Sequence, residues 1–138
     1  IDFTEANLTN ADLSGSALTA DSVYGDALIG FTEANLADAD LSGSTISAFG
    51  SNSYGSITTI NFTAANLANA DLSGSHLTGD SLFGATIDFT EADFTNADLS
   101  GSTLTATSFF DALIDFAEAN LADADLSGAT LIADSNYG

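Results

Sequence analysis

The chain has 138 residues, of which 20 are acidic, one is histidine and none is lysine or arginine, so its formal net charge is −20. Without cations it cannot neutralise nucleic-acid phosphates or be attracted to anionic lipid, and no apolar run approaches the roughly 18 residues of a membrane span. We therefore expect no nucleic-acid partner and no membrane insertion. The lack of cysteine excludes disulfides and thiolate sites, and an apolar fraction of 45% is too high for a disordered acidic tail.

One block of 20 residues recurs along the whole chain. Its first copy reads IDFTEANLTNADLSGSALTA, and the copies begin at Ile1, Ile29, Ile60, Ile87 and Ile114. Variable tails separate the blocks. The repeat predicts a single domain of five units, residues 1–28, 29–59, 60–86, 87–113 and 114–138. These units fill the chain, and we expect no separate cap.

Each block contains a finer period of five residues, seen in Phe3, Leu8, Leu13 and Leu18. Five residues turn an α-helix by about 500°, so successive leucines would not share a helix face. A long regular strand would send them alternately to opposite faces. A short extended piece followed by a corner satisfies the spacing, with positions one and three of each pentad pointing inward.

The segments Ala-Asn-Leu-Thr-Asn at residues 6–10 and Ala-Asp-Leu-Ser-Gly at residues 11–15 resemble the A(D/N)LXX signature of the pentapeptide-repeat family. The resemblance implies an all-β fold, a right-handed parallel β-solenoid known as a quadrilateral β-helix, here with one super-repeat per coil and no globular caps. The tails depart from the signature. We expect each tail to leave a four-sided coil as a surface loop at one corner. The alternative is that the tail forms an extra side of a ring of about 27 residues.

Stacked coils would align equivalent residues in columns about 4.8 Å apart. We expect four inward columns of large apolar residues, flanked by small residues such as Ala6 and Ala11. The first and third columns are Phe3, Phe31, Phe62, Phe89 and Phe116, and Leu13, Leu41, Leu72, Leu99 and Leu126. The second and fourth columns are Leu8, Leu36, Leu67, Phe94 and Leu121, and Leu18, Ile46, Leu77, Leu104 and Leu131.

An outward column of carboxylates is expected at the second pentad position: Asp12, Asp40, Asp71, Asp98 and Asp125. Two unit charges 4.8 Å apart repel by roughly 1 kcal/mol even in water. Bound Ca²⁺, which prefers carboxylate oxygens, would relieve this repulsion. Alternatively, the side chains accept hydrogen bonds from neighbouring backbone at the corners, as aspartates do in turns. Both interpretations stay open, and no other cofactor is required.

Threonines dominate the outward positions of the fourth side, among them Thr45, Thr103 and Thr105. Paired threonine columns on a flat face resemble ice-binding surfaces, although threonine is also simply a good strand former. His76, the only histidine, interrupts the array and has no second histidine or cysteine with which to bind zinc. Since adjacent strand residues point to opposite faces, Ser75 and His76 cannot act together. We therefore expect the chain to have no enzymatic activity.

Both ends of such a solenoid would expose unpaired strand edges and apolar core, with no lysine or proline to protect them. We expect the chain to partner itself head to tail as a homopolymer, forming a structural filament or surface layer outside the cell or at its surface. The absence of Lys and Arg, which removes trypsin-type cleavage sites, favours that location. One alternative follows from the family resemblance, an acidic DNA mimic that binds a DNA-binding protein such as gyrase. The second is ice binding.

Overall fold

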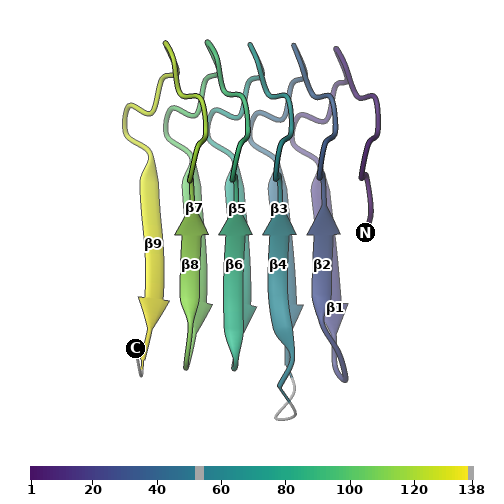
Figure 1. The fold of residues 1–138 in the computed structure, drawn as a ribbon, viewed down its shortest axis with the longest axis vertical. Coiled ribbons are helices and arrows are strands. Elements are labelled where there is room, and N and C mark those ends of the chain that lie inside the picture. The colour runs from purple at the N-terminus through teal and green to yellow at the C-terminus, as the bar shows by residue number, and fades with distance from the viewer. Residues whose placement is uncertain (52–54, 137–138) are drawn as a thin grey trace.

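The chain forms a parallel β-solenoid in the computed structural model, which describes residues 1–51 and 55–136 (Figure 1). No helix occurs among these residues, and so none that could cross a membrane. The strands are β1 (Ala17–Ser22), β2 (Ala27–Gly30), β3 (Thr45–Gly50), β4 (Ile57–Asn61), β5 (His76–Ser81), β6 (Gly84–Asp88), β7 (Thr103–Ser108), β8 (Ala112–Asp115) and β9 (Thr130–Ser135). Odd-numbered strands form one sheet in the order β1-β3-β5-β7-β9, and even-numbered strands form a second sheet in the order β2-β4-β6-β8.

Each coil begins with an arch of three pentads, drawn at the top of Figure 1. In the first coil the corners close when the N–H groups of Ala6, Ala11 and Ser16 donate to the carbonyl oxygens three residues earlier, at 2.9 to 3.1 Å. The last residue of each of these pentads has a φ near +60°. A positive φ at the third turn position is typical of type II turns and favours Gly or Asn. Gly15 adopts this φ without strain, and the backbone angle rather than space favours glycine there, because a Cβ would meet nothing within 4 Å.

The tails are not loops, so the expectation of a four-sided coil with a bulging corner is wrong. β1 continues from the fourth pentad into the tail, and the last two tail residues begin β2. The alternative is what forms: each tail is part of a larger ring, running down one sheet and back up the other. The sheets extend into the tails because each added residue forms backbone hydrogen bonds with the next coil. The side chains of these added residues point alternately to the inside and the outside of the solenoid. Length differences are confined to the tips, residues 23–26, 51–56, 82–83 and 109–111; residues 52–54 lie outside the described part of the chain.

Equivalent residues of the five units stand in strict register. The second residues of the units pair in series from Asp2 to Gly30, Asn61, Asp88 and Asp115. The same holds for the acidic positions, where Asp12, Asp40, Asp71, Asp98 and Asp125 are consecutive bridge partners. The unit boundaries at residues 29, 60, 87 and 114 are therefore structurally equivalent points. The last unit includes residues 137–138, which are not described.

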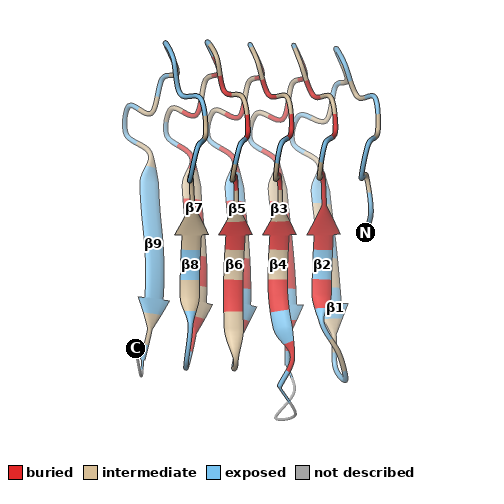
Figure 2. Ribbon diagram, in the orientation of Figure 1, coloured by how far each residue is buried: buried red, intermediate tan, exposed pale blue. Residues whose placement is uncertain are grey.

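The core contains a continuous column of phenylalanine rings. Phe3, Phe31, Phe62, Phe89 and Phe116 stack with centroid separations between 4.6 and 5.2 Å. Phe94 takes the place of a leucine in the second column and packs edge-on against Phe89 at 5.2 Å. Figure 2 shows that the buried residues lie in the middle coils, whereas the first and last coils are open to solvent.

Nearer the tips the two sheets face each other through small residues. Ala48, Gly79 and Ala106 point inward from the odd-numbered sheet, toward Thr58 and Ala85 of the other. A Cβ placed on Gly79 would lie 3.4 Å from the Thr58 hydroxyl and 3.7 Å from the Ala85 Cβ. The solenoid is therefore wide and filled by aromatic and leucine side chains near the arch, and thin near the tips.

A column of buried serine hydroxyls has no hydrogen-bond partner within the described residues. Its members are Ser16, Ser44, Ser75 and Ser102. Ala129 takes the equivalent position in the fifth unit. A buried hydroxyl that has lost water without gaining a partner costs about 1–3 kcal/mol.

Replacing Ser75 by alanine should therefore stabilise the protein by about 1 kcal/mol in urea-unfolding experiments followed by circular dichroism. The matched control is Ser81→Ala. Ser81 is also buried, but its hydroxyl donates to the Ser56 carbonyl oxygen at 2.6 Å, so this change should destabilise by a similar amount. Equal destabilisation by both variants would contradict the assignment of Ser75 as unsatisfied.

Candidate functional site

The column of aspartates at the second pentad position lies on the outside of the arch. In each of its five members, Oδ1 accepts a hydrogen bond from the backbone N–H two residues later, at 2.8 to 3.1 Å. This is the backbone-bonded arrangement expected as the alternative to metal binding. Each aspartate thus stabilises its own corner, whatever ion balances its charge.

These hydrogen bonds favour the ionised form at the two ends of the column. The Ser14 hydroxyl and then the Ser14 N–H hold the pKa of Asp12 below its ordinary value. The N–H of Ser127, followed by its hydroxyl, lowers the pKa of Asp125 in the same way. A depressed folded-state pKa contributes stability that is present above the ordinary carboxyl pKa and is lost as the pH falls through the folded value.

A neighbouring column, five residues earlier in each unit, consists mainly of asparagines, whose amides form hydrogen bonds between coils where carboxylates would repel. It consists of Asn7, Asn35, Asn66, Asp93 and Asn120. The Asn66 amide donates to Oδ1 of Asn35 at 3.1 Å, and the Asn120 amide donates to Oδ1 of Asp93 at 3.1 Å. Hydrogen bonds from the Thr95 hydroxyl and N–H, with a smaller contribution from Asn120, lower the pKa of Asp93.

Calcium binding at Asp12, Asp40, Asp71, Asp98 and Asp125 stays a prediction. Among the described residues no three acidic, histidine or cysteine side chains come together as a group able to hold a metal ion. An ion on this column would therefore bind between the carboxylates of two adjacent coils and take its other oxygens from water or backbone carbonyls.

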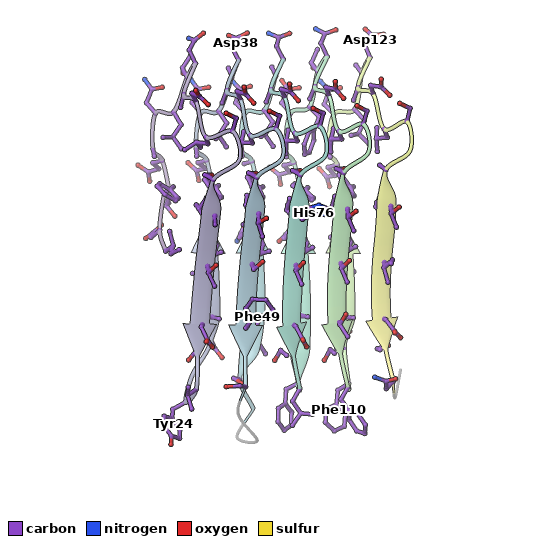
Figure 3. The ribbon with its side chains drawn as sticks, turned by 180° about the vertical axis from the view of Figure 1, so that it is seen from behind. Tyr24, Asp38, Phe49, His76, Phe110 and Asp123 are labelled. Atoms are coloured by element: carbon purple, nitrogen blue, oxygen red, sulfur yellow. The ribbon has the colours of Figure 1, made fainter. Side chains whose placement is uncertain are left out.

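The threonine positions lie on the outer face of the odd-numbered sheet, in two columns that follow the strand register. Thr45 pairs with His76 and His76 with Thr103, so the histidine stands within one column. His76 is exposed on this face (Figure 3), whereas the Ser75 side chain is buried inside the solenoid. The two residues point in opposite directions and do not form a nucleophile and base. Ice binding by the threonine face stays a prediction.

A third outward column was not foreseen from the sequence. It runs through Asp21, Phe49, Asp80, Thr107 and Asp134, which are successive register partners. The signal available in the sequence was the recurring Asp-Ser pair at the start of three tails, at residues 21–22, 80–81 and 134–135. Figure 3 shows the Phe49 side chain lying on the outer face of the odd-numbered sheet, away from the arch.

A groove of about 380 Å³ opens beside Phe49. Its apolar lining comes from Phe49, Leu82 and Phe109, and its polar lining from Ser51, Asp80, Ser81, Thr107, Ser108 and Asn136. Tyr24 and Phe110 lie at the tips below the sheet (Figure 3), where the Phe110 ring stacks on Phe83 at 5.3 Å.

The family model for pentapeptide repeats matches eight copies of the motif, over residues 1–20, 60–86, 87–112 and 114–132, about two thirds of the chain. The chain belongs to the pentapeptide repeat family. Its coils carry the family's pentads in their arches, and its tails are added to that pattern as paired strands. No curated protein shows significant similarity to the chain.

Solved structures similar to this chain include three pentapeptide repeat proteins. One is a protein of the Arabidopsis thaliana thylakoid lumen, 23% identical, with alignment over 86% of this chain and 63% of that one and a TM-score of 0.24. The chain thus spans less than two thirds of the Arabidopsis protein's length. Rfr23 from the cyanobacterium Cyanothece 51142 is 17% identical over 96% and 91% of the two chains, with a TM-score of 0.24. HetL from Nostoc sp. strain PCC 7120, involved in heterocyst differentiation regulation, is 18% identical over 97% and 88%, with a TM-score of 0.22.

Proposed function

We propose that the chain is a structural, non-enzymatic building block whose copies stack end to end into a filament or layer. The single observation that carries this proposal is the open core at each end of the solenoid. Leu131 is 46% exposed in the last coil, whereas its column neighbours Leu77 and Leu104 are 1% exposed. Phe3, Leu8, Leu13 and Leu18 are likewise only partly buried in the first coil. A further coil would bury both sets.

The backbone pattern supports stacking in the same register. In the arch, Leu8 N–H donates to the Asn35 carbonyl oxygen of the next coil at 2.8 Å, and Asn35 N–H donates back to Ala6 at 2.9 Å. By the same rule, the Leu121 N–H and the Ala119 carbonyl of the last coil point toward the position that a following coil would occupy. The Asn7 N–H and carbonyl of the first coil point toward the position of a preceding coil. The last coil of one copy therefore complements the first coil of another.

A stacked interface of this kind is heterologous, so it continues indefinitely where the rotation does not close a ring. Side-chain ladders would also continue across it, because Asn120 would stand over Asn7 of the next copy, as Asn66 stands over Asn35. The net charge of −20 opposes association, and salt weakens that opposition by screening. Assembly should therefore strengthen as the salt concentration rises.

Analytical ultracentrifugation and electron microscopy of the full chain at increasing concentration and NaCl would test the proposal. We expect rods whose length grows with both. Leu131→Lys, which places a charge on the end face, should stop growth. Ile57→Lys is the matched control, since Ile57 is 45% exposed but points outward from β4, an interior strand of its sheet, and it should leave growth intact. A monomer at every concentration and salt, or equal effects of the two variants, would overturn the proposal.

We further propose that the assembly lies outside the cell or on its surface. The chain offers trypsin-like proteases no lysine or arginine, and it has no cysteine that an oxidising environment could modify. Detection of the protein by immunoblot in the cytoplasmic fraction alone would contradict this location. Binding to a DNA-binding protein such as gyrase, and ice binding, stay predictions that a supercoiling assay and a thermal-hysteresis measurement would test.

A further inference from the structure

The groove beside Phe49 combines aromatic walls with one carboxylate. Phe49 is 36% exposed and Phe109 is 39% exposed, and Leu82 lies between their coils. Asp80 is the register partner of Phe49 on one side and of Thr107 on the other. Asp80 is therefore about 4.8 Å from the Phe49 position along the column.

The electrostatic environment of this groove favours a cation. Asp21 is the other register neighbour of Phe49, so carboxylates stand on both sides of the aromatic side chain. The sequence contains no lysine or arginine that could neutralise them. A surface of one sign concentrates ions of the opposite sign in its clefts, and the face of an aromatic ring attracts cations as well.

The lining discriminates between kinds of cation. Ca²⁺ and Mg²⁺ need six or more oxygen ligands, but among the described residues that line the groove only Asp80 carries a carboxylate. A fully hydrated ion gains nothing from Phe49, Leu82 and Phe109. An ammonium group on a short aliphatic chain suits both parts of the lining, because its N–H groups can donate to Asp80 while its methylenes cover the apolar side chains.

We propose that this groove binds a small alkylammonium ion. The ammonium nitrogen lies against the Asp80 carboxylate and near the Phe49 ring, and the alkyl chain extends over Leu82 toward Phe109. Thr107 and Asn136 also line the groove and would supply hydrogen-bonding groups to a second polar group of the ligand. This binding does not depend on end-to-end stacking, since all the lining residues come from one chain.

The test is an NMR titration of the ¹⁵N-labelled full chain with n-butylammonium chloride. Two parallel titrations separate the contributions: NaCl at matched ionic strength supplies charge alone, and n-butanol supplies the alkyl chain alone. We expect butylammonium to give saturable shifts centred on residues 49–51, 80–82 and 107–109, and neither control to saturate. Shifts spread evenly along the acidic columns, or equal responses to butylammonium and NaCl, would overturn the proposal.

Variants then locate the site. Asp80→Asn should weaken butylammonium binding about tenfold, the loss that accompanies about 1.4 kcal/mol. Asp38→Asn makes the same change in net charge at the arch (Figure 3), where Asp38 accepts a hydrogen bond from the Asn69 amide that asparagine can also accept, and it should change the affinity less than twofold. Phe49→Thr, which copies Thr107 of the same column, should weaken binding about threefold through lost cation–π attraction. Equal effects of Asp80→Asn and Asp38→Asn would contradict the assignment.

Discussion

Phe62→Ala is expected to lower the free energy of unfolding by about 3–5 kcal/mol, the usual cost of removing a buried aromatic side chain. Phe62 is fully buried and stacks on both Phe31, at 4.6 Å, and Phe89, at 5.2 Å. The loss leaves a gap in the middle of the column that the rigid ladders on either side cannot close. Urea unfolding followed by circular dichroism measures the change.

Phe3→Ala provides the matched control. Phe3 has one ring neighbour in its column, Phe31 at 4.9 Å, and is only partly buried. The same truncation there should cost less than half as much, since cavity formation requires enclosure. Equal losses at Phe3 and Phe62 would mean that the column does not carry the stability of the middle coils.

The triple variant Asp40→Asn, Asp71→Asn and Asp98→Asn should be more stable than the natural sequence by up to about 3 kcal/mol at low salt. These residues are the central members of the acidic column, and each neighbouring pair repels across one coil spacing. Asparagine keeps the Oδ1 acceptor for the N–H groups of Ser42, Ser73 and Ser100. It also adds an amide donor, like the one that joins Asn66 to Asn35 in the neighbouring column.

The salt concentration provides the control for this variant. The Debye length is about 8 Å at physiological salt, longer than the coil spacing, and about 3 Å at 1 M. The gain should therefore persist at 0.15 M NaCl and shrink strongly at 1 M. A gain that is the same at every salt concentration would show that the repulsion between carboxylates is not its cause. Thermal melts of the variant and the natural sequence at these salt concentrations measure the gain in stability.

The arches were predictable from the sequence because a five-residue period has few structural solutions. The spacing of Phe3, Leu8 and Leu13 excludes a helix and a long strand, and the recurrence of the block places equivalent residues over one another. Asp12 and its equivalents could be placed on the outside by the same argument. Whether their oxygens bound metal or backbone could not be decided, because both options need only an exposed carboxylate at a corner.

The tails were misjudged because variable length usually marks a loop. Here the variation lies only in the tips, and the residues beside them pair as regularly as the arches do. Phe49-Gly50 aligns with Asp21-Ser22 and Asp80-Ser81 in the ladder, although the residue types differ. The groove beside Phe49 could not be predicted, since it depends on this alignment and on an aromatic residue that occurs once in its column.

Repeats differ in length only at their tips, residues 23–26, 51–56, 82–83 and 109–111. A repeat can gain or lose residues at its tip without shifting any hydrogen bond in the ladders above, so duplication and insertion act on separate parts of the unit. In the proposed end-to-end assembly, foreign peptides grafted between Leu82 and Phe83 would be displayed along one margin of the filament. Their spacing would be fixed by the stacking distance rather than by the sequence inserted.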